Sequence, residues 1–538
     1  MDKEQDSYDV IAVGAGIGGL YAVHRFRQQG LSVLCLESAA GIGGVWYHNR
    51  YPGARVDIDS VDYCYYFSPE LFRDWKWSER YASQPELLAY LNHVADRFDL
   101  RRHIRLNTRV TSAQWHPGDK RYEVGTEGGR RFRCRYLVMT TGQLSAARDP
   151  EFPGLKDFKG ADSKGEWVQA SHWPDRPVRI AGRRVAVIGT GSSGVQAIPV
   201  IAETAAHLYV FQRSPNFVVP AQNGPLDEAQ WKQIGANVPA EREHVFATPG
   251  ANHRRRGPRP AAECTPEERQ ALLEAQWAAG GQGMNAVFSD QAVNKQANDY
   301  VADFVRAKIR KRVKDPAVAE LLCPYDHPIG TRRLCLDTHY YEAYNRDNVT
   351  LVNLRGNAIE RITPTGIQTA DGRHYEVDLI VFALGFHAFT GALRDANIKN
   401  ERGETVVDLW KRGPQTLLGI QTRGFPNLFI VTGAGSTSVL ATMTLVNEFH
   451  IDWIAECIAH MQRHGYKTVE PELEAQNRWT EHVAEVASKI LRRNVRNYMV
   501  HVNDDGSRVF MPYVAGFDKY VKAVREHTAD SYRGFCFK

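Results

Sequence analysis

The sequence has no paired-cysteine motif. Its eight cysteines stand singly, and no two are separated by only two residues. A disulfide reductase would need a CxxC dithiol and a zinc knuckle would need closely spaced cysteines, so the pattern argues against both kinds of site, and no metal is expected. Isolated cysteines are typical of a reducing compartment. They are Cys35, Cys64, Cys134, Cys264, Cys323, Cys335, Cys457 and Cys536.

The sequence also lacks a long apolar segment and a strong excess of one charge. Its longest uncharged stretch, residues 424–447, contains glycine, proline, serine and threonine, which disfavours a membrane span. The first residues are polar and acidic, so we expect no signal peptide. A net charge of +5, from 67 basic and 62 acidic residues, is too small to indicate a nucleic-acid partner. We therefore expect a cytoplasmic protein with no membrane partner.

Positive charge is concentrated locally in HRRRGPRP, residues 253–260. Charge runs of this kind usually form solvated loops, and we adopt that interpretation. The alternative is that the segment lies over an anionic cofactor.

A glycine-rich turn lies near the start of the chain. The apolar run 10–13 predicts a strand, and Gly14, Gly16 and Gly19 form GxGxxG before a predicted helix. The first glycine permits the turn, the second lets a pyrophosphate approach the backbone, and the third lets helix and strand pack closely. Glu37 ends the next predicted strand, where a carboxylate can accept hydrogen bonds from a ribose. The motif predicts a dinucleotide, either NAD or the adenosine half of FAD.

The next segment, GIGGVWYHNRYPGARVDIDS at residues 41–60, is too rich in glycine, proline and aromatics for a helix or a central strand. It suits a loop folded against a flat ring system. Asp57 and Asp59 lie near Arg50 and Arg55 in this loop. A surface loop held by ion pairs explains these charges equally well.

A second GxGxxG turn, formed by Gly189, Gly191 and Gly194, again lies between a predicted strand and a predicted helix. At the end of its second strand, Arg213 and Ser214 replace the acid. An acid would repel a 2′-phosphate, whereas arginine can bind one, so we expect NADPH here. Two nucleotide folds with different ribose-binding residues indicate electron transfer from NADPH to a bound flavin. The expected fold class is α/β, with two Rossmann-like dinucleotide-binding domains.

The remaining segments suggest how the domains are divided. Residues 223–324 are polar with helical spacing and predict a mainly helical insertion that caps the NADPH-binding domain. Two adjacent arginines, Arg332 and Arg333, are costly to bury unless anions lie close to them, which suggests a nearby anionic group. The alternative is that they form a solvent-exposed basic corner. Residues 375–386 predict one buried strand. The expected parts are 1–145 and 381–538 for the FAD-binding domain, 146–222 (with the linker) and 325–380 for the NADPH-binding domain, and 223–324 for the insertion.

Together these features resemble the type I Baeyer–Villiger monooxygenases from Tyr8 to the C-terminus. The resemblance rests on both glycine turns, on GGVWYHNRYPGARVD, on RRLCLDTHYYEAYNRDNV and on the linker FKGADSKGEWVQASHWPD, residues 158–175. The linker matches the family pattern FxGxxxHxxxWP once residues 161–165 are set aside, with Gln169 in place of histidine. We expect these five residues to form a surface bulge and the linker to be irregular, because a regular element would fix the angle between moving domains. Tyr498 stands where the family often has tryptophan.

The resemblance implies an NADPH- and O₂-dependent enzyme that converts small-molecule ketones to esters or lactones through a flavin peroxide. Arg333 matches the residue that stabilises the anionic peroxide, and Asp57 matches the acid that positions it, so both are expected catalytic residues. The residues expected to bind FAD or NADPH are Gly14, Gly16, Gly19, Glu37, Trp46, Arg55, Asp57, Tyr63, Val110, Met443, Gly189, Thr190, Gly191, Ser192, Ser193, Gly194, Gln196, Arg213, Ser214, Arg332 and Arg333.

Other functions remain as alternatives. A flavin monooxygenase that oxygenates nitrogen or sulfur would share both glycine turns and a similar linker. The complete GGVWYHNRYPGARVD loop together with Arg333 favours ketone oxidation over it. A non-catalytic NADPH-binding sensor is disfavoured because both nucleotide motifs are complete.

Overall fold

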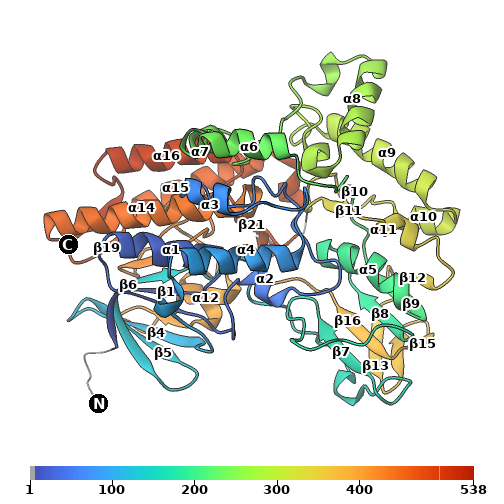
Figure 1. Ribbon diagram of the computed structural model, residues 1–538, viewed down its shortest axis with the longest axis horizontal. Helices are drawn as coiled ribbons and strands as arrows, with labels where there is room; N and C mark the ends of the chain where they lie inside the picture. The colour runs from blue at the N-terminus through green and yellow to red at the C-terminus, as the bar shows by residue number, and fades with distance from the viewer. Residues whose placement is uncertain (1–5, 496, 504) are drawn as a thin grey trace.

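The computed structural model describes residues 6–495, 497–503 and 505–538. Two α/β halves lie side by side, and the C-terminus lies at the outer end of the first half (Figure 1). No helix in these described ranges is both long and apolar enough to cross a membrane.

The first half is built on an eight-stranded sheet. Its strand order is β17-β4-β5-β6-β1-β2-β3, and β18 also pairs with β6. Alternate residues of β1 face two different cores: Val10 and Ala12 pack against helices α1 and α14, whereas Ile11 and Val13 pack against β4, β5 and β6. The strands are β1 (Ser7–Val13), β2 (Val33–Leu36), β3 (Ile104–Arg105), β4 (Val110–His116), β5 (Arg121–Thr126), β6 (Arg131–Met139), β17 (Ile398–Lys399) and β18 (Leu428–Ile430).

Helices of the first half come from distant parts of the sequence. Helix α1 (Ile17–Gln28) packs against β1 and β2 of the sheet and against α14 (Met443–His464). The other helices are α2 (Val45–His48), α3 (Pro69–Asp74), α4 (Gln84–Arg97), α12 (Gly391–Asp395), α13 (Val406–Leu409), α15 (Leu473–Ser488) and α16 (Phe517–Ala529). Short strand pairs are formed by β19 (Val469–Pro471) with β22 (Phe535–Phe537) and by β20 (Val500–Val502) with β21 (Arg508–Phe510).

The second half is built on a five-stranded parallel sheet in the order β12-β9-β8-β16-β7. An antiparallel sheet of β13, β14 and β15 lies beside it, and β10 pairs with β11. The elements are β7 (Glu166–Gln169), β8 (Arg184–Ile188), α5 (Ser192–Thr204), β9 (His207–Gln212), β10 (Val218–Pro220), β11 (Cys335–Asp337), α11 (Tyr340–Ala343), β12 (Val349–Asn353), β13 (Ile359–Thr363), β14 (Gly366–Thr369), β15 (His374–Glu376) and β16 (Leu379–Phe382).

Two local expectations were wrong. The run 375–386 is not one strand, because it contributes to β15 and β16 in different sheets. Between them Asp378 accepts hydrogen bonds from the backbone and guanidinium of Arg184, which turns the chain. The linker is also less irregular than expected, since its residues 166–169 form β7 at the edge of the parallel sheet.

The five-residue bulge in the linker is confirmed as a surface feature. Residues 162–164 are exposed, and Gly165 N–H donates to Lys159 C=O at 2.5 Å to close the bulge. Its base is fixed by Arg183, a buried arginine that bonds Asp162 at 3.1 Å. Gln169 makes a local contact, accepting from Ser171 Oγ at 3.3 Å.

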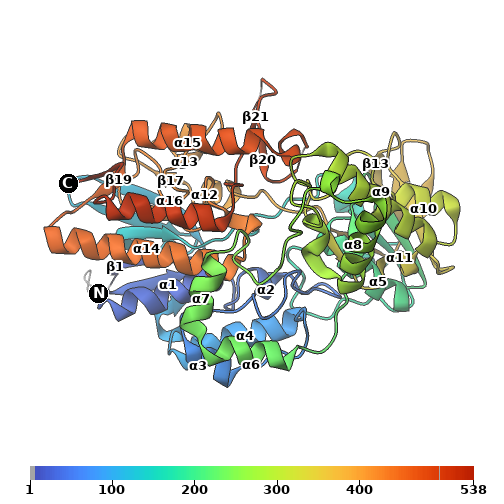
Figure 2. The ribbon, with the colours of Figure 1, turned by 90° about the horizontal axis from the view of Figure 1, so that it is seen from above.

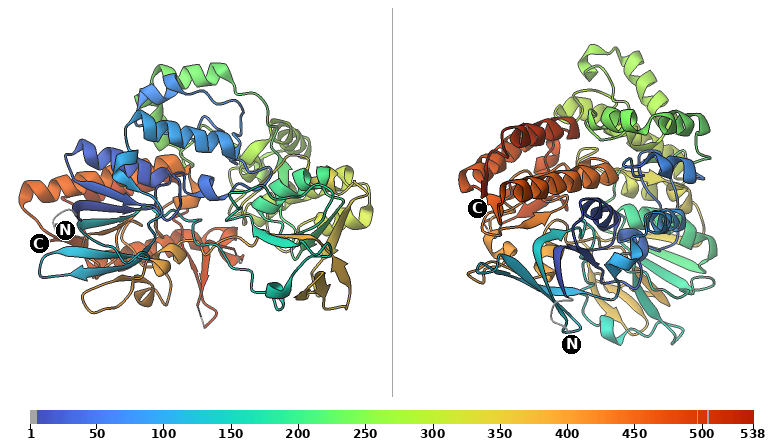
Figure 3. Two further views of the ribbon diagram at one scale, coloured as in Figure 1. Left: turned by 60° about the horizontal axis from the view of Figure 1, so that its bottom comes forward. Right: turned by 60° about the vertical axis from the view of Figure 1, so that its left-hand side comes forward.

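The insertion is mainly helical, as expected, but it does not cap one half alone. Helices α8 (Pro266–Ala279), α9 (Lys295–Arg312) and α10 (Pro316–Leu322) lie over the second half, whereas α6 (Glu228–Ala236) and α7 (Val238–Phe246) lie over the first (Figures 1 and 2). The Trp231 ring of α6 stacks on Phe72 of α3 at 4.7 Å. Figure 3 shows the same division from two further sides.

An ion-pair cluster fastens α7 to α14. Arg242 of α7 bonds Glu448 at 3.0 Å and Asp452 at 2.7 Å, and the Glu448 side chain is fully buried. A buried carboxylate needs such a partner, so the pairing of Arg242 with Glu448 holds this part of the insertion against the first half.

Candidate active site

The first glycine turn leaves a helix end open to an anion. Gly14 has φ +102°, and a Cβ on Gly19 would lie 1.9 Å from Gly14 C=O, so only glycine lets α1 approach the turn. No described side chain caps α1, whose N-cap residue is Gly16. The first N–H groups of the helix therefore need an outside acceptor.

Glu37 lies beside this turn, directly after β2. Its carboxylate is buried and accepts from Ala15 N–H at 2.7 Å and from Ala39 N–H at 2.8 Å. These bonds fix the carboxylate next to the backbone where a ribose would lie.

The aromatic loop after the turn connects the two halves. Trp46 Nε1 donates to Tyr63 Oη at 3.1 Å, and burial raises the pKa of Tyr63 to about 12, so this hydroxyl stays neutral. Tyr51 Oη donates to Gln196 Oε1 at 2.8 Å, and Gln196 Nε2 donates to Arg55 C=O at 3.0 Å. Because Gln196 belongs to α5, the loop lies between the two glycine turns.

Asp57 and Arg333 form a bidentate pair across 276 residues of sequence. Arg333 Nε and Nη2 donate to the two carboxylate oxygens at 2.5 and 2.6 Å, and Nη1 donates to Val439 C=O at 3.2 Å. Burial acts to lower the pKa of Arg333, but the charge and hydrogen bonds of Asp57 raise it above its ordinary value. The guanidinium is therefore a fixed positive charge held in one plane.

Arg333 lines a cavity of about 260 Å³. Its walls come from the loop after α7, from the insertion, from residues 437–441 and from residues 490–492 and 498–499. Tyr498 lines it as well, and burial raises the pKa of this phenol. Thr437 is a further wall residue, and its buried hydroxyl has no hydrogen-bond partner in the described chain.

The second glycine turn repeats the geometry of the first. Gly189 has φ +112°, and a Cβ on Gly194 would lie 2.1 Å from Gly189 C=O. Ser192 and Ser193 begin α5, which again has no cap from any described side chain. Space is open around Gly191, so a phosphate can reach the backbone.

A larger cavity of about 510 Å³ lies at the end of β9. Arg213 and Ser214 line it, together with Asp326 and Arg355, and Thr190 Oγ1 donates to Ser214 C=O at 3.2 Å. Arg332 Nη2 bonds Asp326 at 3.1 Å. The hydrogen bond from His327 and the charge of Arg332 hold the pKa of Asp326 well below its ordinary value.

Comparison with known proteins shows the family. A model of the pyridine nucleotide-disulphide oxidoreductase family matches residues 11–223. The 2-oxo-Δ³-4,5,5-trimethylcyclopentenylacetyl-CoA monooxygenase of Pseudomonas putida is 40% identical, over 98% of both chains. A Baeyer–Villiger monooxygenase of Pseudooceanicola batsensis is 38% identical, over 98% of this chain and 95% of the other.

The chain belongs to the Baeyer–Villiger monooxygenases.

A solved structure of a related enzyme, OTEMO in complex with FAD and NADP, has a TM-score of 0.94 and 40% identity over 99% of both chains. The two Rossmann-like domains expected from the sequence are thereby confirmed. The family requires FAD and NADPH, as the two glycine turns predict. A disulfide reductase is disfavoured because no two cysteines have the CxxC spacing of a redox dithiol, and seven of the eight are buried.

The residues present fit both cofactors. Each glycine turn offers uncapped helix N–H groups, and Gly16 lies so close to Gly44 that a Cβ on Gly44 would be 3.0 Å from Gly16 Cα. Next to the start of α14, the hydroxyls of Thr437 and Ser438 are buried and have no partner among the described residues. Such orphaned hydroxyls fit contacts with a polar group of a bound cofactor.

Most expected cofactor residues lie around these two turns. Val110 begins β4 and is buried, and Met443 begins α14, whose first turn contacts α1: a Cβ on Gly18 would lie 2.4 Å from Asn447 Oδ1. Arg55 is different, since its guanidinium donates to Glu79 at 3.0 Å and to Tyr81 C=O at 3.3 Å. For Arg55 the ion-pair interpretation agrees with the observed contacts.

Sequence reasoning missed several arginines of this monooxygenase. Arg355 follows β12, the parallel neighbour of β9, so its position beside Arg213 could have been inferred from the rule that parallel strands end at one edge. Arg254, Arg256 and Arg492 line the smaller cavity with Arg333. Arg254 and Arg256 belong to the basic segment 253–260, for which a solvated loop was favoured, and Arg492 reaches the cavity from a separate loop that no spacing in the sequence connects to it.

Proposed function

We propose that this enzyme inserts one oxygen atom from O₂ into a small ketone, giving an ester or lactone, with Arg333 and Asp57 as its catalytic pair. The observation that carries the proposal is the bidentate contact between these residues at the wall of the smaller cavity. Bound FAD, once reduced by NADPH, supplies the activated oxygen.

Arg333 provides positive charge where negative charge develops on the reacting oxygens. Among the described residues, Asp57 and Val439 accept hydrogen bonds from three of its five N–H groups, and the other two lie toward the cavity, with the Tyr498 hydroxyl as a neighbour. Donors fixed before the reaction stabilise developing charge without reorganisation. Asp57 thus positions the guanidinium and keeps it charged.

Arg213 is proposed to bind the 2′-phosphate of NADPH. It lines the larger cavity, and the described part of the chain gives it no carboxylate partner, which leaves its charge available. Arg332 is already paired with Asp326, so we propose that it supports the same cavity through that carboxylate.

The domain division of the sequence is retained as a proposal with one change. Strands β17 and β18 join the first sheet, which supports assigning the C-terminal part to the FAD-binding domain. Strand β16 ends at Phe382 in the second sheet, so the return to that domain is placed after Phe382 rather than at 381. A reducing, cytoplasmic compartment is part of the proposal and is supported by the free cysteines.

The test is to purify the protein, measure its FAD content and follow oxygen-dependent NADPH oxidation with a panel of ketones, amines and sulfides. Mass spectrometry should find ketone products with one added oxygen atom. Oxygen transfer to amines or sulfides with no ester from any ketone would favour the alternative activity. A yellow protein that transfers oxygen to none of these would refute the proposal.

A further inference from the structure

The basic segment at residues 253–260 is not a simple solvated loop. Arg254 and Arg256 line the cavity that contains Arg333, and Arg492 reaches it from the loop after α15. Arg255 and Arg256 are both exposed residues, but only Arg256 belongs to the wall. Three arginines other than the catalytic one therefore converge on the reaction cavity.

No salt bridge joins these three arginines to a carboxylate within the described ranges of the chain, although Asp518 lies close enough to Arg256 to oppose the lowering of its pKa by burial. The carboxylates of the cavity wall are already paired: Asp59 with Arg80 at 2.5 Å and Asp62 with His253 at 2.6 Å. Arg254 Nε is buried and has no acceptor among the described residues, and Arg492 donates to Gly330 C=O but to no carboxylate among them. Arg254 and Arg492 therefore bring positive charge to the cavity that no described carboxylate pairs with.

That charge is electrostatically unfavourable without a ligand. Burial and the neighbouring charge of Arg256 lower the pKa of Arg254, and burial lowers the pKa of Arg492 to about 10. Partly buried cations of this kind are stabilised by an anion that accepts their hydrogen bonds.

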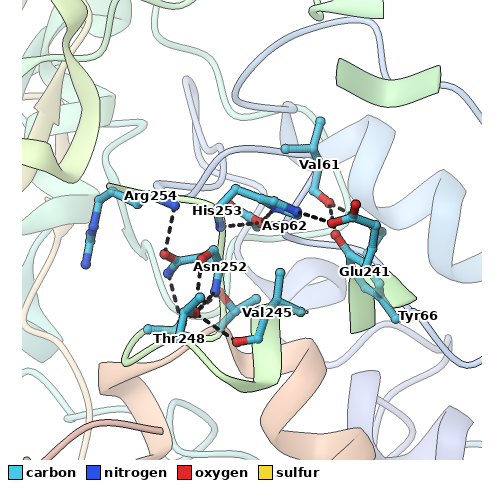
Figure 4. Close-up of polar contacts among 12 residues, drawn as sticks. Val61, Asp62, Tyr66, Glu241, Val245, Thr248, Asn252, His253 and Arg254 are labelled. Atoms are coloured by element: carbon cyan, nitrogen blue, oxygen red, sulfur yellow. Dashed lines mark hydrogen bonds and ion pairs between the residues drawn. The ribbon is translucent and has the colours of Figure 1, made fainter. Parts of the chain in front are cut away.

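The loop that presents Arg254 is held in place from behind. His253 bonds Asp62 at 2.6 Å and Glu241 of α7 at 3.2 Å, and Asn252 Oδ1 accepts from Arg254 N–H at 3.2 Å. Figure 4 shows these contacts, with the Arg254 side chain pointing away from them. The backbone that carries the Arg254 guanidinium is therefore positioned before a ligand arrives, which lowers the entropic cost of binding.

The proposed phosphate contacts of NADPH lie elsewhere. Neither the phosphate turn at residues 189–196 nor Arg213, Ser214 and Arg332 belongs to the described wall of this cavity. A phosphate of NADPH bound at those residues would therefore not neutralise the three arginines. An anionic group on the substrate, bound in this cavity, would neutralise their charge.

We propose that Arg254, Arg256 and Arg492 bind an anionic group, a carboxylate or phosphate, on the ketone substrate, so that the enzyme prefers ketones that carry an acid. The inference rests on the proposed ketone oxidation and specifies its substrate class. The acid would be held at one side of the cavity while the carbonyl lies near Arg333.

The experiment compares 3-oxocyclohexanecarboxylate with its methyl ester, which differ in charge but have the same ring. We expect kcat/KM for oxygenation to favour the acid by about ten- to a hundredfold, the range of one or two charge-assisted hydrogen bonds. In Arg254→Gln and Arg492→Gln this preference should fall about tenfold or more, whereas the matched control Arg255→Gln should keep it. FAD content is measured for each variant to show that it is folded.

Wild-type protein alone also tests the idea. The rate with the acid should fall as salt rises while the rate with the ester stays level, because salt screens charge. Equal kcat/KM for acid and ester would overturn the inference while leaving ketone oxidation intact. An increased KM for NADPH in Arg254→Gln with an unchanged acid preference would also overturn it, by assigning the arginine to the nucleotide. Failure to oxygenate either ketone or any other ketone of the panel would count against the proposed function itself.

Discussion

Replacing Arg333 by alanine should stop ester formation without releasing FAD. The guanidinium makes three hydrogen bonds at 2.5–3.2 Å, two of them to Asp57, and its side chain is 30% exposed. A single preorganised donor to a developing oxyanion contributes roughly a hundred- to a thousandfold in rate, about 2.7–4 kcal/mol. We expect a loss of that size or larger, because Arg333 supplies both charge and more than one donor.

The same change leaves the Asp57 carboxylate without its partner. Its side chain is only 19% exposed, and removing one member of a well-buried pair costs about 3–5 kcal/mol. Partial exposure should reduce this cost, so the variant should fold with a lower melting temperature. Arg333→Lys tests the geometry separately, because lysine keeps the charge but cannot make the bidentate contact. Its rate should lie between those of the wild type and Arg333→Ala.

The assay measures FAD content, NADPH oxidation, hydrogen peroxide and ester for each variant. Arg333→Ala should continue to oxidise NADPH and release hydrogen peroxide in place of ester. Arg332→Ala is the neighbouring comparison: its partner is Asp326 at the other cavity, so its main effect should be an increased KM for NADPH. Ester formation by Arg333→Ala at the wild-type rate, with normal FAD content, would refute the assignment.

Four further predictions follow from the same geometry. Arg213→Glu should remove most of the preference for NADPH over NADH, about ten- to a hundredfold, in steady-state kinetics with both cofactors; equal use of NADH by the wild type would contradict it. Gln169→Leu should cost less than about 1 kcal/mol in denaturant unfolding, because its bond to Ser171 is partly exposed. Deleting residues 161–165 should preserve FAD binding, because Gly160 and Gly165 lie next to each other in space and the shortened chain can therefore close across the base of the bulge. The deletion should lower the melting temperature, because Arg183 loses its ion pair with Asp162. Burial lowers the pKa of His450 to about 3, below its value of about 6.5 in the unfolded chain, so protonation of the unfolded chain destabilises the fold as the pH drops below 6.5. Between pH 7 and 5 the free energy of unfolding should therefore fall by about 2 kcal/mol more in the wild type than in His450→Gln. Parallel pH profiles of the two proteins would contradict this.

The sequence predicted those parts of the molecule in which a local motif decides the structure. Each glycine turn needs positive φ and close packing at fixed spacing, so Gly14, Gly19, Gly189 and Gly194 could be assigned their roles from the sequence alone. Arg213 follows from its place at the end of a strand. The pairing of Asp57 with Arg333 came only from family resemblance, because nothing local links residues so far apart.

Features that depend on tertiary pairing were not predictable in this way. Residues 166–169 have little strand pattern of their own and become β7 because the edge of β16 accepts them. The run 375–386 reads as continuous, yet Asp378 divides it by bonding Arg184. The arginines of the reaction cavity belong to this second group, since their charges converge only after the loops have folded.

The division of the insertion has a consequence for how such enzymes can diversify. Its first helices are fastened to one nucleotide fold through Arg242, and its later helices rest on the other. The loop between them, which includes Arg254 and Arg256, is thus anchored to one fold at each end. It contains neither a glycine turn nor a member of the Asp57–Arg333 pair. Residues there can be exchanged while the glycine turns and the Asp57–Arg333 pair stay constant. Substrate range and oxygen chemistry are therefore separable traits, and directed evolution confined to residues 253–260 should alter the first without rebuilding the second.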